Sequence, residues 1–200
     1  MTDPRSHWPL AGYDELRDRL LAAYSSPDRG YHDLRHLEEV LDRLLELLSV
    51  EGAGVDRDAV LLAAWFHDAV YDGASDDEER SAELAGDALA GLDTALATEV
   101  ARLVRITAAH QPADDDLAGQ LLCDADLAIL ASDPERHASY VAGVRREYAA
   151  VPDHEFRQGR AAVLRALLAK PTLFHTTHAR TAWEGAARAN VTRELEELLP

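Results

Sequence analysis

Three stretches of the sequence have the pattern of buried helix except that each carries side chains able to bind a cation or move a proton. The first is the apolar run from Leu61 to Phe66, which leads directly into His67 and Asp68. A buried carboxylate is costly unless it is paired, hydrogen-bonded or bound to a cation, and a neighbouring imidazole suits the same cation. The pair therefore indicates either a cation site or a hydrogen-bonded helix end.

The second stretch runs from Leu121 to Leu130, where Asp124 and Asp126 interrupt an apolar helix. Residues two apart on a helix point about 200° away from each other, so at most one of these acids can share a cation with the first stretch. We expect the other acid to support a neighbouring side chain or backbone group.

The third stretch has an apolar stripe at helical spacing, formed by Leu37, Val40, Leu41, Leu44 and Leu48. Toward the N-terminus the same face continues through His36 and His32. A histidine at this edge is either a hydrogen-bonded core residue or a metal ligand. The interpretation as a metal ligand is favoured because three separate helices each bring a group able to bind a metal to the interior.

The elements that must position these residues are all helical. Prolines punctuate the chain, and between them the apolar residues recur at steps of three and four. The pattern predicts an all-α chain in which residues 1–200 form one domain of about eight to ten helices. The expected helices cover 11–24, 32–49, 57–71, 77–90, 94–110, 117–131, 134–150, 153–169 and 179–198.

The chain carries a formal net charge of −17 and has no dense block of Lys or Arg. This charge repels nucleic acid and anionic lipid, so we expect neither a nucleic acid polymer nor a membrane as partner. A phosphate site would need local positive charge from a metal, from arginines or from both. No span of membrane length and no leader is apparent, which predicts a cytoplasmic protein. The lone Cys123 is expected to be buried, as are Trp65, Trp183 and Phe174.

The order His36, His67-Asp68, Asp126 resembles the signature of the HD superfamily of metal-dependent phosphohydrolases. The flanking segments Tyr31 to Leu37, Trp65 to Asp72 and Asp124 to Leu130 are similar to a subgroup of predicted HD phosphohydrolases with no settled substrate. Later segments also resemble it, so the likeness covers a core of about 24–198. The resemblance implies an HD-type helical bundle.

The resemblance also implies a divalent metal held by His36, His67, Asp68 and Asp126. Two imidazoles and two carboxylates suit Mn, Fe, Co, Ni or Mg and leave coordination positions open. A water and a phosphoryl oxygen in those positions would permit hydrolysis of a small phosphate ester or nucleotide-like substrate without a covalent intermediate.

Several other residues have predicted roles in the site, some of them with an alternative role. Asp72, expected one helical turn after Asp68, would act as general acid or base with it, or would cap a turn before Gly73. Glu78 and Asp124 would support the site, although Glu78 fits an ordinary helix start equally well. The expected substrate-binding residues are His32, Arg35, His110, Arg146 and Arg160, with Arg105 a further candidate; the arginines could instead form exposed ion pairs.

Two other functions and a further partner are also compatible with the sequence. A metal or nucleotide sensor without turnover, or a di-iron oxygenase using His32 and His110, would carry the same ligands. Besides a small phosphorylated substrate, a second copy of the chain is a candidate partner. The remaining histidines are expected at the surface, namely His7, His137, His154, His175 and His178.

Overall fold

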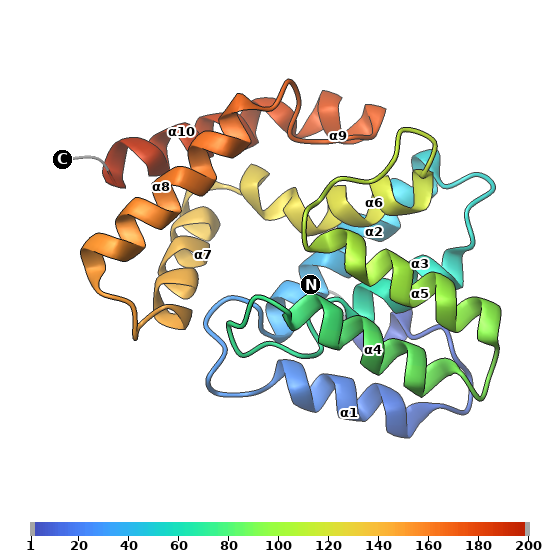
Figure 1. Ribbon diagram of the computed structural model, residues 1–200. Coiled ribbons are helices and arrows are strands. Elements are labelled where there is room, and N and C mark those ends of the chain that lie inside the picture. The colour runs from blue at the N-terminus through green and yellow to red at the C-terminus, as the bar shows by residue number, and fades with distance from the viewer. Residues whose placement is uncertain (1–2, 199–200) are drawn as a thin grey trace.

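The computed structural model describes residues 3–198 and confirms that the chain is all-α (Figure 1). Within that range there are ten α-helices and two short 3₁₀ helices, and no strand. The elements in chain order are η1 (Pro4–His7), α1 (Asp14–Tyr24), α2 (Leu34–Glu51), α3 (Arg57–Phe66), α4 (Asp77–Leu89), α5 (Thr94–Thr107), α6 (Leu117–Leu127), η2 (Ala128–Ala131), α7 (Pro134–Glu147), α8 (Asp153–Ala169), α9 (Thr177–Ala182) and α10 (Glu184–Leu198).

Aspartate side chains fix where many of the helices begin. Asp33, Asp56, Asp93, Asp116 and Asp133 each stand before a helix and accept hydrogen bonds from backbone N–H groups of its first turn. Such a cap contributes about 1 kcal/mol, and a negative charge also suits the helix N-terminus. Part of the acidic composition therefore stabilises the helices directly.

The apolar helix α3 lies at the centre of the fold. Every residue from Ala59 to Phe66 is buried, and α3 packs against α2, α4, α5 and α6. Trp65, Trp183 and Phe174 are in the core and Cys123 is fully buried, as the sequence predicts. No helix in residues 3–198 is both long enough and apolar enough to cross a bilayer.

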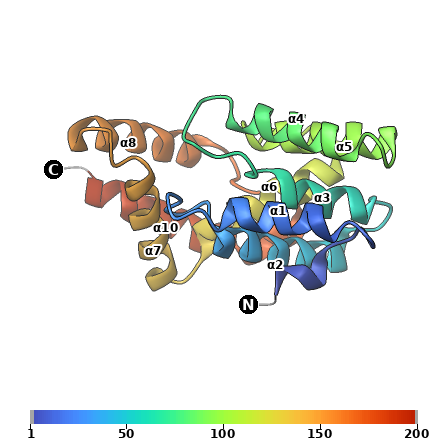
Figure 2. The same cartoon turned by 90° about the horizontal axis from the view of Figure 1, so that it is seen from below.

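The helices fall into two groups in both views. α1 to α6 gather around α3, whereas α7, α8 and α10 lie at the other end of the molecule (Figures 1 and 2). η2 joins the groups: it follows α6 directly and packs against α7 and α10.

The expected helix over 57–71 is too long, because α3 ends at Phe66. The N–H of His67 still donates to the Ala63 carbonyl, but at Asp68 and Val70 tertiary partners replace the helical hydrogen bonds. The N–H of Asp68 donates to the hydroxyl of Tyr24, and the Ser81 hydroxyl accepts from the N–H of Val70 and donates to its carbonyl. The expected helix over 179–198 is likewise divided, into α9 and α10 at Trp183.

Candidate metal centre

The ends of three helices meet at one point in the core. His36 lies in the first turn of α2, which Asp33 caps. His67 directly follows α3, Asp68 comes next, and Asp126 lies in the last turn of α6. Helices with independent caps and buried faces thus deliver side chains that are far apart in the sequence to the same place.

Three of these side chains converge closely. The Nε2 atoms of His36 and His67 are 3.1 Å apart, and Asp68 Oδ2 lies 3.2 Å from the first and 3.1 Å from the second. One ligand atom from each of the three residues lies within 4.8 Å of the others. Both histidines are only 1% exposed, so the donors face one another rather than solvent.

Asp126 lies beside this group with its two oxygens facing different partners. Its Oδ1 is 3.3 Å from His36 Nε2 and 3.7 Å from His67 Nε2, whereas its Oδ2 is 2.8 Å from His110 Nε2. All four residues expected to hold a metal are therefore brought together. Asp126 also links them to His110, the one residue other than glycine in 3–198 with a positive φ, of 48°.

The cluster strongly favours positive charge. Burial lowers the pKa of each imidazole, but the carboxylates of Asp68 and Asp126 outweigh it, raising the pKa of His36 and holding that of His67 well above its ordinary value. Burial raises the pKa of both carboxyl groups, but the surrounding histidines outweigh it and hold both values well below the ordinary range. The same electrostatics would favour a divalent cation.

Groups outside the cluster fix its orientation. Ala64 carbonyl oxygen is 2.8 Å from His67 Nδ1, which can donate to it and leave the Nε2 lone pair directed at the cluster. The Tyr24 hydroxyl accepts the Asp68 N–H at 3.2 Å. Such outer contacts typically accompany metal-binding histidines. The donor set and its orientation are therefore able to hold a metal ion.

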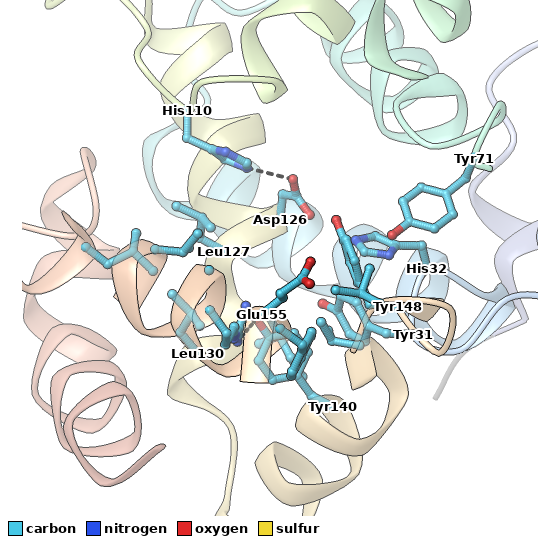
Figure 3. Close-up of a pocket in the computed structure, with 18 residues that line it drawn as sticks. Tyr31, His32, Tyr71, His110, Asp126, Leu127, Leu130, Tyr140, Tyr148 and Glu155 are labelled. Atoms are coloured by element: carbon cyan, nitrogen blue, oxygen red, sulfur yellow. Dashed lines mark hydrogen bonds and ion pairs between the residues drawn. The ribbon is translucent and has the colours of Figure 1, made fainter. Parts of the chain in front are cut away.

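A cavity of about 590 Å³ opens beside this cluster (Figure 3). Asp126, His110 and His32 line it, so the candidate metal centre forms part of its wall. His32 stacks on the ring of Tyr71, with centroids 4.2 Å apart. The volume lies within the range of about 300–1,000 Å³ that is common for small-molecule sites.

Glu147, at the end of α7, holds the loop that carries His32. Its Oε1 accepts the backbone N–H groups of residues 30, 31 and 32, and its Oε2 lies 2.9 Å from His32 Nδ1 and accepts the Tyr71 hydroxyl. Beside it, Gly30 and Gly143 touch backbone to backbone, and a Cβ on either would collide with the carbonyl oxygen of the other. This role of Glu147 could not be inferred from the sequence, because its partners are distant in the chain.

Most of the arginines expected to supply positive charge lie outside the cavity of about 590 Å³. Arg35 instead lines a second cavity of about 260 Å³ together with His36 and Asp126, and it shares the Glu39 carboxylate with Arg136. Arg35 pairs with Glu39 at 3.0 Å, Arg105 pairs with Glu79 at 2.7 Å, and Arg146 donates to the carbonyl of Gly30. Of the candidates only Arg160 lines the larger cavity, where it pairs with Glu194 and donates to the Tyr140 hydroxyl, both at 2.6 Å.

The two acids after the His67-Asp68 pair lie differently from the expectation. Asp72 is not one helical turn from Asp68, because α3 has already ended; its side chain is 59% exposed, pairs with Arg80 and does not line the cavity. Glu78 lies in the first turn of α4, where the neighbouring Asp77 is the buried acid that accepts three backbone N–H groups.

Asp124 faces away from the cluster, which agrees with the expectation that at most one of Asp124 and Asp126 can point toward it. It is fully buried and accepts the backbone N–H groups of His175 and Thr176, at 2.8 and 2.7 Å, just before α9. His137 was expected at the surface and is instead 3% exposed, with Nε2 3.6 Å from Glu194.

Comparison of the chain with models of protein families, with curated proteins and with solved structures finds no match in any of the three. What the residues and their geometry establish is a helical domain with a buried His/His/Asp group able to hold a metal ion.

Proposed function

We propose that the protein is a metal-dependent phosphohydrolase of the HD type that acts on a small phosphate ester. The observation that carries this proposal is the convergence of His36, His67, Asp68 and Asp126 at the wall of a cavity of small-molecule size. When bound there, one divalent ion would polarise a phosphoryl oxygen and lower the pKa of an attacking water.

The chain's own groups would orient the reactants and hold the proton. Asp68 and Asp126 would each keep one oxygen toward the ion, with Asp68 fixed at its backbone by Tyr24 and Asp126 fixed at its other oxygen by His110. We assign the proton for the leaving group to His32, since it lines the cavity with Nδ1 fixed by Glu147. Asp72 has no part in this proposal because it lies outside the cavity.

The test is to strip the purified protein of metal, load it with Mn, Fe, Co, Ni or Mg in turn, and screen phosphate esters. His67→Ala and Asp68→Ala should each abolish both bound metal and turnover while retaining the helical circular dichroism signal. His154→Ala is the control, because that side chain is 76% exposed and lies outside the cavity. A variant of His67 or Asp68 that hydrolyses as fast as the parent would refute the proposal.

Metal stoichiometry separates the alternatives. One divalent ion per chain with turnover supports a hydrolase, whereas two irons per chain would favour an oxygenase. Tight binding of one ion without turnover of any ester would instead identify a sensor.

A further inference from the structure

The cavity beside the candidate metal centre is mostly apolar away from the metal. Of its eighteen lining residues, five are aromatic and seven are aliphatic (Figure 3). One wall is a face of α8 that presents Phe156, Gly159, Val163 and Leu167 at helical spacing. Val163 is 51% exposed, so part of this apolar face is open to solvent.

Charged groups on the same walls leave little for a second anionic group to bind. Among the described residues that line the cavity, only Arg160 carries a permanent positive charge, and the buried carboxylate of Glu194 neutralises it at 2.6 Å. Glu155 adds a negative charge to the lining. Within this cavity, as residues 3–198 form it, a polyphosphate chain that extends away from the metal would find no unpaired cation, and the polar groups left there are mainly tyrosine hydroxyls such as that of Tyr31.

From this arrangement we propose that the alcohol part of the ester is a single apolar group, aromatic or branched aliphatic, which lies against α8 and carries one phosphoryl group. The phosphoryl end of this inference rests on the proposed function. The apolar end rests on the cavity walls alone. A nucleotide-like substrate, one of the expectations from the sequence, fits these walls less well because its sugar and further phosphates are polar.

A substitution at Gly159 can fill the apolar part of the cavity with a side chain. A Cβ added there meets no atom within 4 Å, and the same holds for Gly185 in α10, which does not line the cavity. Gly159 lies in the middle of α8 and Gly185 in the first turn of α10, and both have room for a side chain, so leucine should be tolerated at either position. Gly159→Leu and Gly185→Leu thus form a matched pair that differs in whether the new side chain enters the cavity.

The first measurement uses naphthol, an apolar alcohol without phosphate, titrated by calorimetry into the metal-free protein. The parent and Gly185→Leu should bind it equally, and Gly159→Leu should bind it about tenfold more weakly or worse. Val163→Asp, compared with the similarly exposed Val50→Asp on α2, should show the same loss. If naphthol does not bind, or binds Gly159→Leu as tightly as the parent, the inference is overturned.

The second measurement compares hydrolysis of naphthyl phosphate and adenosine monophosphate by the metal-loaded protein. We expect kcat/KM to be at least about tenfold higher for naphthyl phosphate and to fall toward the adenosine value in Gly159→Leu. Equal or better hydrolysis of adenosine monophosphate overturns the apolar substrate while the proposed function stands. If no ester is hydrolysed with any ion, the proposed function fails, and the naphthol titration still decides whether the cavity takes an apolar group.

Discussion

Replacing Glu147 by glutamine should destabilise the protein at neutral pH and flatten its response to acid. The Glu147 side chain is 4% exposed and accepts three backbone N–H groups as well as a bond from Tyr71. Burial raises the pKa of this carboxyl group, but His32 and the loop N–H groups outweigh it and lower the pKa from 4.5 to about 2. Glutamine keeps the shape of the side chain and removes the charge.

The pKa shift sets the size and the pH window of the effect. Because the folded-state pKa lies below the ordinary value of 4.5, the stabilisation is fully present above about pH 4.5 and is lost as the pH falls toward about 2. At 1.36 kcal/mol per pH unit, the shift corresponds to about 3 kcal/mol of unfolding free energy at pH 7. The difference between parent and Glu147→Gln should therefore be largest at neutral pH and shrink below about pH 4.5.

Urea unfolding followed by circular dichroism at pH 7, 5, 4 and 3 measures this directly. Glu79→Gln provides the control: Glu79 pairs with Arg105 at 2.7 Å but is 50% exposed, so its change should be small beside that of Glu147→Gln. A difference for Glu147→Gln below about 1 kcal/mol at pH 7, or one that does not shrink in acid, would contradict this account of the carboxylate.

Two further substitutions separate support of the site from support of the fold. His110→Gly removes the partner of Asp126 Oδ2 but relieves a left-handed backbone, so metal titration should show binding at least about tenfold weaker while thermal unfolding changes by less than about 1 kcal/mol. A large loss of stability with unchanged metal affinity would show that the strained histidine serves the fold instead. Asp124→Ala should do the opposite: two buried backbone N–H groups lose their acceptor, which costs about 2–4 kcal/mol in urea unfolding, while metal affinity is retained. Equal losses in both measurements would mean that the two faces of α6 are not independent.

The helices, and the arrival of metal-competent groups from three of them in the core, could be predicted because apolar periodicity reveals the buried face of each helix. The choice of Asp126 rather than Asp124 as a ligand came from the resemblance to the HD superfamily. His36, His67 and Asp126 each continue or interrupt such a face, so their direction follows from the local sequence. The split between Asp124 and Asp126 follows from helical geometry alone.

The end of α3 could not be predicted in the same way. No glycine or proline follows Phe66 closely, and the chain leaves the helix because Tyr24 and Ser81, from other segments, take over its hydrogen bonds. Asp72 was misplaced for that reason, since its expected role assumed that the helix continued.

Two residues of α7 were not predicted to be buried, for different reasons: the sequence contains a pattern that indicates burial for one of them and none for the other. His137 shares helical spacing with Tyr140 and Val144, and that stripe indicated a buried position. Glu147 offered no comparable pattern, because the loop that it caps lies far earlier in the chain and only the folded structure brings the two together.

The backbone contact between Gly30 and Gly143 has a consequence for recognising related chains. Because neither position has room for a side chain, any chain that builds this wall needs glycine at both, together with an acid in the place of Glu147 to fasten the loop. The His67-Asp68 pair alone could also occur in helical proteins that lack the contact between Gly30 and Gly143. The two glycines are thus a criterion, separate from the candidate ligands, for a chain that holds the His32 loop in the same way.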